Sequence, residues 1–552
     1  MRICISQLNP TIGAIQENVK KIIREIEKVK KAHEKNPVEL IIFPEMAISG
    51  YSPDDLLLQS GFLEAVHKGL EEIIKSCSSI ACIVGLPRRD LEHKDKPLCN
   101  SAAVIVNGKL VGYQDKALLP TYDVFDERRY FQPAISEKVW HIADARVGLT
   151  ICEDIWAFSG APRQERYAHD PLEVFEKKRI DLLINISASP YSIEKIELRN
   201  EVAKKASQKL SCPVILCNQV GAQDGIIYDG TSIVVSEKRG LLVKMASFQE
   251  ESQIFDTKDL EPRTMVSVEP AAELFSALTL GVKDYFAKQG FTKALVGLSG
   301  GVDSALVAVI ASVALGKKNV LGVLLPSRFT SSESTEDALY VASNLGINTV
   351  EIPIEKAYKT YLELLAPVFD DKPIDVTEEN LQARIRATLL MAIANKEGYL
   401  LLNTSNKSEL ACGYSTLYGD AAGAIAVIGD LLKRQVYEVA NWVMKTYGWI
   451  TPRILEKAPS AELRLNHKDS DSLPEYGILD PIIEEYVVNL KSAESIAEKV
   501  GCPLTLVYEV ISKIHQNEYK RRQCPFSLRV SEKAFSAGRR VPIVHRFLPT
   551  TS

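Results

Sequence analysis

Two adjacent glycines, Gly300–Gly301, constrain the fold of this chain more than any other feature of its sequence. The apolar residues 294–297 before them are typical of a buried strand, and residues 305–310 after them are typical of the first turns of a helix. Glycine lets the backbone turn tightly, and the free N–H groups at the start of a helix attract anions. Hydroxyl groups and a carboxylate lie in the same segment, at Ser299, Ser304 and Asp303. This loop predicts a phosphate-binding site at the carboxyl end of a parallel strand.

The glycine pair belongs to the segment Leu-Ser-Gly-Gly-Val-Asp-Ser, which lacks the Gly-Lys-Ser/Thr ending of the common NTPase loop. It resembles instead the loop of the ATP pyrophosphatases, enzymes that cleave ATP between the α and β phosphates and adenylylate a substrate. The resemblance implies that ATP is a co-substrate. It also implies an ATP-binding set made of Gly297, Leu298, Ser299, Gly300, Gly301, Val302, Asp303 and Ser304.

The composition narrows the class of protein. The chain has 552 residues, which at roughly 150 residues per domain predicts two to four domains. Its 46% hydrophobic and 25% charged residues are typical of a soluble globular protein, and a net charge of −5 gives no reason to expect a nucleic-acid partner. No apolar run approaches the roughly 20 residues of a membrane span, so we expect no membrane partner. The ten cysteines form no Cys-x-x-Cys pair, which argues against a disulfide framework or a zinc site and favours a cytoplasmic location.

Strands and helices alternate along the first half, which predicts an α/β layered domain. Expected strands cover residues 2–7, 38–43, 80–85, 102–106, 109–113, 147–151, 182–186, 214–217 and 233–236, and an expected helix covers residues 17–33. Asn107–Gly108, between two of these strands, predicts a hairpin turn.

The segment 256–270 breaks this alternation, because it contains two prolines and little periodicity. We therefore place a domain boundary there and expect domains at residues 1–262 and 263–552. Helices expected at 273–288 and 332–345 then alternate with strands expected at 293–298, 319–324 and 349–354. This pattern predicts a doubly wound parallel sheet in the second half.

Three reactive residues in the first half each follow an expected strand: Glu45, Lys116 and Cys152. Together they form a complete set for amide cleavage. The thiol attacks the carbonyl carbon, and the carboxylate takes the thiol proton and returns it to the leaving ammonia. The ammonium favours the thiolate and stabilises the oxyanion. Each residue alone also has an ordinary structural explanation, such as a buried cysteine or a solvated lysine.

The segments around these residues favour the catalytic interpretation. Phe43–Glu45, Asp115–Pro120 and Ile151–Asp154 resemble the three motifs of the nitrilase superfamily, in the same order. The resemblance covers roughly the first 260 residues. It implies an α-β-β-α sandwich with Glu45, Lys116 and Cys152 as the catalytic triad.

Neighbouring segments indicate the amide donor. Residues 122–131 and 187–191 resemble those of glutaminase members of the superfamily. The resemblance implies that glutamine is the substrate and that its amino-acid end is held by Tyr122, Ser189 and Lys195.

The second half resembles NAD synthetases over several long segments, at 379–386, 403–410, 413–420, 459–463 and 518–523. This resemblance implies two further ATP-binding residues, Thr404 and Lys433. It implies three residues that bind nicotinic acid adenine dinucleotide (deamido-NAD), which are Asn380, Glu409 and Lys520. Carboxylates near polyphosphate need a cation, so Mg²⁺ is expected at Asp303 and Glu409. Arg384 and Arg386 suit phosphate binding, but a surface role is equally compatible with the sequence.

Both halves together resemble the glutamine-dependent NAD synthetases. The resemblance implies that glutamine supplies ammonia, that ATP adenylylates deamido-NAD, and that ammonia displaces AMP to give NAD⁺. It also implies a homodimer or a larger homo-oligomer. Two alternatives stay open: another amidating synthetase, since GMP and asparagine synthetases have a similar ATP loop, or a nucleotide-sensing module that regulates an amidase.

Overall fold

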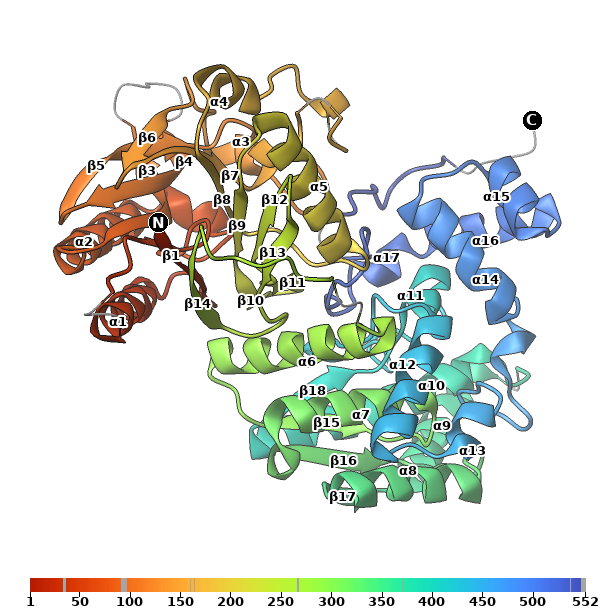
Figure 1. Ribbon diagram of the computed structural model, residues 1–552. Helices are drawn as coiled ribbons and strands as arrows, with labels where there is room; N and C mark the ends of the chain where they lie inside the picture. The colour runs from red at the N-terminus through yellow and green to blue at the C-terminus, as the bar shows by residue number, and fades with distance from the viewer. Residues whose placement is uncertain are drawn as a thin grey trace. The chain divides into compact units, whose positions relative to one another are not determined.

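The computed structural model describes residues 1–32, 36–90, 97–158, 160–162, 164–265, 268–370, 372–536 and 538–547. The chain divides into two compact units, Met1–Ser267 and Val268–Ser552 (Figure 1). The boundary expected after residue 262 stays a prediction, and part of the expected boundary segment, residues 266–267, lies outside the described residues. Among the described helices, none combines the length and apolarity that a bilayer crossing requires.

The first unit contains two six-stranded sheets. One sheet has the order β14 (Glu251–Asp256), β1 (Arg2–Gln7), β2 (Leu40–Ile42), β3 (Ala81–Arg89), β4 (Leu98–Val106) and β5 (Lys109–Asp115). The other has the order β13 (Gly240–Lys244), β12 (Ile233–Ser236), β9 (Val214–Asn218), β8 (Leu182–Ser187), β7 (Ala145–Ile151) and β6 (Val139–Ile142). A separate hairpin joins β10 (Val220–Gln223) to β11 (Ile226–Asp229).

Helices cover the outer face of each sheet. The first sheet packs against α1 (Ile15–Ala32) and α2 (Ser60–Ser76), and the second packs against α4 (Leu172–Lys178) and α5 (Lys195–Leu210). Side chains alternate between the two faces of a strand, so Ile3 and Ile5 enter the core between the sheets whereas Cys4 enters the core under α1 and α2. The predicted α-β-β-α sandwich is therefore confirmed. Short helical turns, which are η1 (Asp54–Leu58), α3 (Glu127–Tyr130), η2 (Cys152–Ile155) and η3 (Gln164–Arg166), lie in the connections.

Most expected elements of the first unit are present, with shifted ends. The expected helix 17–33 is α1, and its last expected residue, His33, lies outside the described residues. The hairpin at Asn107–Gly108 is confirmed: both residues have positive φ, and Val106 pairs with Lys109.

The second unit contains one five-stranded sheet in the order β17 (Asn348–Glu351), β16 (Val320–Leu324), β15 (Ala294–Gly297), β18 (Leu400–Asn403) and β19 (Ile425–Ala426). All of its pairings are parallel. The strand order reverses between β15 and β18, and ligands of such folds bind at the carboxyl ends of the strands at that reversal. The predicted doubly wound parallel sheet is therefore confirmed.

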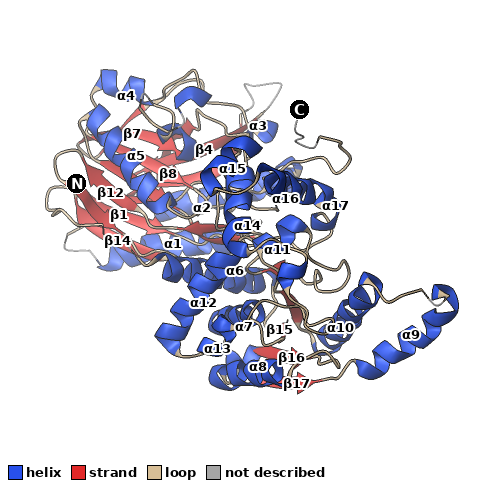
Figure 2. Ribbon diagram, turned by 90° about the vertical axis from the view of Figure 1, so that its right-hand side faces the viewer, coloured by secondary structure: helices blue, strands red, loops and turns tan. Residues whose placement is uncertain are grey.

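Helices lie on both sides of this sheet; Figure 2 shows α7 (Val302–Leu315) and α10 (Val376–Glu397) on opposite sides of β15. The other helices and turns up to the end of the sheet layer are α6 (Pro270–Gln289), η4 (Lys317–Asn319), α8 (Ser332–Leu345), α9 (Glu355–Phe369), α11 (Lys407–Cys412), α12 (Lys433–Tyr447) and α13 (Pro452–Glu456). A helical region with its own apolar core follows, made of η5 (Asp469–Asp471), α14 (Tyr476–Ile483), η6 (Glu484–Val488), α15 (Ala493–Val500), α16 (Leu504–Gln516) and α17 (Glu518–Arg521).

Candidate active sites

Glu45, Lys116 and Glu127 form a buried charged cluster in the first unit. The Lys116 ammonium donates to Glu45 Oε1 at 2.9 Å and to Glu127 Oε1 at 2.6 Å. Tyr51 donates its hydroxyl to the same Glu127 oxygen at 2.6 Å. Burial works against the charged lysine, but the carboxylates of Glu127 and Glu45 outweigh it and raise the pKa of Lys116 well above its usual value. Lys116 is therefore a permanent cation beside Glu45.

A tight turn after β2 holds Glu45. Residues 44–46 pass so close to Gly85 of β3 that a Cβ at this glycine would lie 2.3 Å from the Met46 nitrogen and 2.6 Å from the Glu45 Cα. Only glycine fits at such an approach. The packing of β3 against this turn thus buries the Glu45 carboxylate.

Glu127 is a member of the cluster to which the sequence analysis gives no role. Burial raises the pKa of the Glu127 carboxyl above its ordinary value, although Lys116 acts in the opposite direction. The only sequence signal was its position within the glutaminase-like segment 122–131. Its contact with Lys116 depends on tertiary packing, so strand and helix patterns could not reveal it.

Cys152 follows β7 and has a φ of 46°, in the left-handed region that non-glycine residues rarely occupy. Such strain is often found at functional positions. Burial raises the pKa of the Cys152 thiol far above its usual range, and the charge of Glu45 adds to this effect while Lys116 opposes it. The expectation that Lys116 favours the thiolate is right in direction, but burial dominates. The resting thiol is neutral and needs a base.

Asp154 joins the segment after Lys116 to the segment that holds Cys152. One of its oxygens accepts the backbone N–H groups of Ala117 and Leu118, at 3.1 and 2.8 Å, and the other accepts that of Ile151 at 2.9 Å. Burial raises the pKa of Asp154 to about 7, although these backbone hydrogen bonds lower it. Asp154 therefore fixes the distance between the two segments.

The three expected glutamine-binding residues surround the same cluster. The Tyr122 hydroxyl lies 2.8 Å from a carboxylate oxygen of Glu153, the residue after Cys152. The Lys195 ammonium lies 4.4 Å from the centre of the Trp156 ring, at the end of the turn that Cys152 begins. Ser189 is buried, and it follows Ala188, whose N–H donates to Glu45 at 2.8 Å. The binding of glutamine by these three residues stays a prediction.

In the second unit, the glycine loop joins β15 to α7, which confirms the predicted strand–loop–helix order. Gly300 has a φ of 80°, and a Cβ there would lie 2.1 Å from the backbone oxygen of Ser334 at the start of α8. The two serine hydroxyls of the loop, Ser299 and Ser304, lie 3.1 Å apart. The loop is thus folded tightly against α8, with the N-terminus of α7 behind it.

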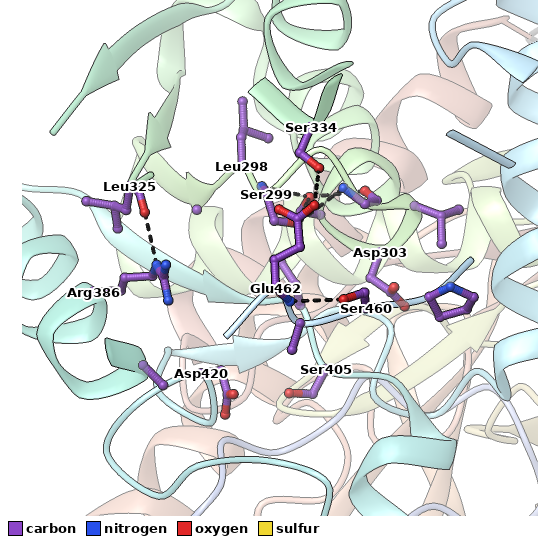
Figure 3. A pocket seen from close by; sticks show the side chains of 18 of the residues that line it. Leu298, Ser299, Asp303, Leu325, Ser334, Arg386, Ser405, Asp420, Ser460 and Glu462 are labelled. Carbon is purple, nitrogen blue, oxygen red and sulfur yellow. Dashed lines mark hydrogen bonds between the residues drawn. The ribbon is translucent and has the colours of Figure 1, made fainter. Parts of the chain in front are cut away.

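A cavity of about 320 Å³ opens at this loop (Figure 3). Of the expected ATP-binding residues, those that line it are Gly297, Leu298, Ser299, Gly301, Val302, Asp303, Ser304, Thr404 and Lys433. Gly300 is not in the lining. The cavity lies where the strand order reverses, in agreement with the sequence prediction.

Asp303, Glu409 and Lys433 form the charged end of this cavity. The Lys433 ammonium lies 2.5 Å from Asp303 and 3.5 Å from Glu409. Asn406 donates its amide to both carboxylates, at 2.9 and 2.6 Å. Burial raises the pKa of Glu409 to about 8, with the Asp303 charge adding to this and Lys433 opposing it. Two partly buried carboxylates with one lysine between them fit the oxygen ligands that Mg²⁺ prefers.

Asn380 and Lys520 lie apart from the cavity lining. Asn380 accepts the Thr416 hydroxyl at 2.7 Å, and Lys520 donates to the carbonyls of Gly413 and Ser415 at 2.8 and 2.9 Å. Both residues thus contact the segment 413–420, whose residues Gly419 and Asp420 line the cavity. Asn380 and Lys520 are therefore connected to the cavity through the segment 413–420 and do not line it themselves.

The two arginines of α10 differ in position. Arg386 lines the cavity and donates to the Leu325 carbonyl at 3.0 Å, as Figure 3 shows. Arg384 is exposed and donates to the Leu417 carbonyl at 3.2 Å. Burial lowers the pKa of Arg386 to about 10, which is still high enough to keep it charged. Arg386 is therefore a cation of the cavity that the sequence left undecided.

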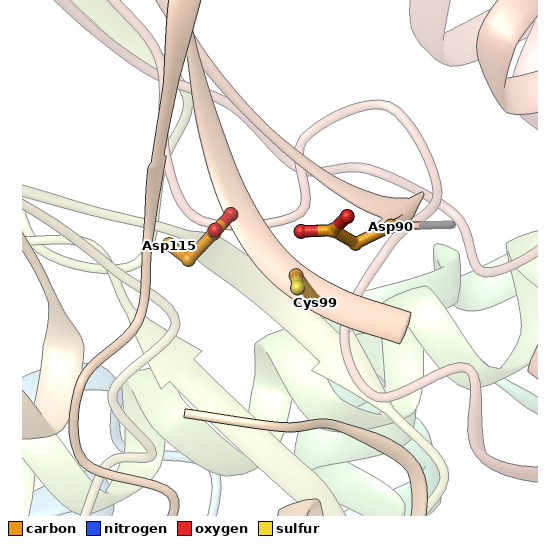
Figure 4. A group of neighbouring side chains, drawn as sticks. All are labelled: Asp90, Cys99 and Asp115. Carbon is orange, nitrogen blue, oxygen red and sulfur yellow. The ribbon is translucent and has the colours of Figure 1, made fainter. Parts of the chain in front are cut away.

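Another cluster of ligand-type side chains, Asp90, Cys99 and Asp115, lies in the first unit (Figure 4). Arg88 forms ion pairs with both carboxylates, at 3.2 Å to Asp90 and 2.7 Å to Asp115. Because Arg88 already pairs with both carboxylates, we assign the cluster a structural role.

Two family models match the chain. A carbon-nitrogen hydrolase model matches residues 2–261, and an NAD synthase model matches residues 274–524.

Proteins that match over nearly the whole length are glutamine-dependent NAD(+) synthetases. The chain is 42% identical to the one from Synechocystis sp., with 100% of both chains covered, and 39% identical to the one from Thermotoga maritima, with 99% of both covered. It is 34% identical to the Acinetobacter baumannii enzyme, solved in complex with ADP, with a TM-score of 0.77 and 98% of both chains covered. The Cytophaga hutchinsonii structure, at 22% identity and a TM-score of 0.84, covers 99% of this chain and 98% of its own and shows the same fold.

Proposed function

The chain belongs to the family of glutamine-dependent NAD(+) synthetases, and from this premise we propose that it makes NAD⁺ in two coupled reactions. The first unit hydrolyses glutamine to glutamate and ammonia. The second unit uses ATP to adenylylate the nicotinate carboxylate of deamido-NAD, and ammonia then displaces AMP.

In the first reaction, Glu45 acts as the general base and Cys152 as the nucleophile. Glu45 takes the proton of the neutral thiol, and the sulfur attacks the amide carbon of glutamine. The Lys116 ammonium stabilises the negative charge that develops on the amide oxygen. Glu45 returns the proton to the leaving ammonia and then activates the water that hydrolyses the thioester. Tyr122, Ser189 and Lys195 hold the amino-acid end of glutamine, and Lys195 supplies the positive charge for its carboxylate.

In the second reaction, the loop 297–304 and the start of α7 hold the phosphates of ATP. Thr404 and Lys433 complete the ATP site, and Arg386 offers a further cation. The nicotinate carboxylate attacks the α-phosphate, and pyrophosphate leaves. Adenylylation is needed because a carboxylate is a poor electrophile at neutral pH. Asn380, Glu409 and Lys520 are the proposed contacts to deamido-NAD.

Mg²⁺ would be held by Asp303 and Glu409. When bound, it neutralises phosphate charge and makes the departure of pyrophosphate easier. Lys433 contacts both carboxylates in the structure, so we expect it to turn from them towards the phosphates when metal and ATP enter.

The observation that supports this proposal is the presence of two separate candidate sites in one chain: the buried Glu45–Lys116 pair near Cys152, and the glycine loop that lines the cavity of the second unit. The test is NAD⁺ formation by the purified protein with ATP, Mg²⁺, deamido-NAD and either glutamine or ammonium. We expect product from both nitrogen sources, with one AMP and one pyrophosphate per NAD⁺.

Two controls separate the alternatives. Amidation of xanthosine monophosphate in place of deamido-NAD would identify another amidating synthetase. Glutamate release that does not respond to ATP and deamido-NAD, without pyrophosphate, would identify a regulated amidase.

The proposal includes a homodimer or larger homo-oligomer in the cytoplasm. Support for self-association comes from α9, on which Tyr361, Leu364 and Val368 are 45%, 69% and 70% exposed. Their spacing puts them on one face of the helix. Exposed apolar residues grouped in this way are typical of protein interfaces.

A further inference from the structure

One residue of β4, Asn100, contacts both Glu45 and Lys116. Its side-chain amide donates to Glu45 Oε1 at 2.7 Å. Its backbone carbonyl accepts the backbone N–H of Lys116 at 2.8 Å. Asn100 is 1% exposed, so water cannot replace either contact.

The β4–β5 pairing explains why one residue reaches both. Ser101, the next residue of β4, pairs with Asp115, the last residue of β5. The Asn100 carbonyl therefore continues the ladder by one bond and holds Lys116 directly beyond the strand end. Neighbouring residues of a strand point to opposite faces, so Cys99 and Ser101 face away while the Asn100 amide faces the Glu45–Lys116 pair.

The Glu45 carboxylate is held by donors at both oxygens. Oε1 accepts from Lys116 and Asn100, and Oε2 accepts the backbone N–H of Ala188 at 2.8 Å. Of these donors, Asn100 is the one neutral side chain. Asn100 can therefore restrain the rotation of the Glu45 carboxylate without adding charge. A hydrogen-bond donor to an ionised carboxylate also favours the ionised form.

The amide orientation of Asn100 depends on Glu45. Its carbonyl oxygen, Oδ1, is buried and has no hydrogen-bond partner among the described residues. In the opposite orientation this oxygen would face Glu45 Oε1, acceptor against acceptor. The Asn100 side chain is therefore oriented by its hydrogen bond to Glu45. In this orientation its own oxygen, Oδ1, stays buried without a partner among the described residues.

We propose that Asn100 is a positioning residue for glutamine hydrolysis: it keeps the Glu45 carboxylate ionised and correctly rotated to take the Cys152 proton. The inference rests on the proposed function of the first unit and adds a residue to it. Asn100 does not contact the reacting atoms itself and acts through Glu45.

The test compares Asn100→Leu and Asn100→Asp with the unchanged protein, in full-length form. Leucine removes the donor at similar volume, and aspartate adds a third carboxylate to the cluster of Glu45 and Glu127. We expect Asn100→Leu to lower kcat for glutamate release about 30- to 100-fold, within the range that general-base catalysis contributes, with KM for glutamine changed less than about threefold. The acid limb of the kcat/KM profile should move to higher pH in both variants, because Glu45 is then protonated more readily.

Asn18→Leu is the matched control. Asn18 is also a buried asparagine of the first unit, but it bonds to Thr11 and Ile48 and not to Glu45. We expect the acid limb to stay in place in this variant, even if activity falls. Ammonium-dependent NAD⁺ formation should be unchanged in all three variants, which shows that the second unit of each is intact.

An Asn100→Leu variant with near-normal kcat, or with a lower kcat but an unmoved acid limb, would overturn the proposal. If that variant does not fold, an unmoved acid limb in Asn100→Asp has the same meaning. Glutamate release by the unchanged protein tests the proposed function itself. If the unchanged protein releases no glutamate, both the proposed function and the role of Asn100 are refuted; if it does, the variants test the role of Asn100 alone.

Discussion

At the scale of single residues, burial and neighbouring charges together decide the protonation states around Cys152. The thiol is neutral, Lys116 is charged, and the pKa of Asp154 is raised to about 7. In the proposed mechanism, glutamine hydrolysis therefore depends on proton transfer to Glu45 and not on a preformed thiolate, which also protects the nucleophile from oxidation between turnovers.

Asp154 makes stability dependent on pH. A raised pKa means that the folded protein holds the proton where the unfolded chain has lost it, so this contribution is complete at low pH and is lost as the pH rises through about 7. Asn at this position cannot titrate. We expect the free energy of unfolding of the unchanged protein, relative to Asp154→Asn, to fall by about 2–3 kcal/mol between pH 5 and pH 8. Urea unfolding of both proteins at both pH values measures this change. If the difference in free energy of unfolding between the two proteins is the same at pH 5 and pH 8, Asp154 is not protonated in the folded protein.

At the scale of secondary-structure elements, the proposed phosphate site depends on the contact of one glycine with α8. Gly300→Ala puts a Cβ 2.1 Å from the Ser334 carbonyl in addition to the strain of positive φ. Gly316→Ala, at the other end of α7, has similar φ but nothing within 4 Å of its Cβ.

We expect Gly316→Ala to lower the free energy of unfolding by about 1–3 kcal/mol and to leave activity unchanged. Gly300→Ala should in addition reduce ammonium-dependent NAD⁺ formation up to about 100-fold, because a displaced loop misplaces the phosphates, while glutamate release continues. Equal synthetase activity in the two variants would mean that the close approach to α8 has no catalytic role.

Many of the secondary-structure elements could be predicted from the sequence, but not all of them. Local patterns predicted the strands that end at Glu45 and Cys152, the hairpin before Lys116 and the strand–loop–helix at Gly300, because periodicity and glycine positions are local properties. The β10–β11 hairpin and the pairing of β14 with β1 were not predicted. The latter joins Arg2 to Asp256, and contacts between distant segments leave no local pattern.

Contacts between distant segments also account for what was missed in the candidate sites. Glu127 and Asn100 reach Lys116 and Glu45 through tertiary packing, and neither residue type at its position predicts that contact. The expectation that Asn380 and Lys520 bind deamido-NAD stays a prediction; both contact the segment 413–420, which lines part of the cavity.

At the scale of the whole molecule, we expect the protein to self-associate through the exposed apolar face of α9, formed by Tyr361, Leu364 and Val368. Leu364→Glu together with Val368→Glu places two charges on this face. We expect the double variant to have half the mass of the unchanged protein, or less, in light scattering at equal concentration. Exposed Lys359→Glu on the same helix is the charge control. An unchanged oligomer in the double variant would exclude α9 as the interface.

The central claim is that one chain carries two separable chemistries joined by ammonia. The most direct measurement is NAD⁺ formation by Cys152→Ala with glutamine and with ammonium, beside the unchanged protein. Loss of the thiol should abolish synthesis from glutamine, by about 1,000-fold or more, because no acyl intermediate can form. Synthesis from ammonium should stay within about twofold of normal. Loss of both activities, or retention of both, would contradict the division of labour.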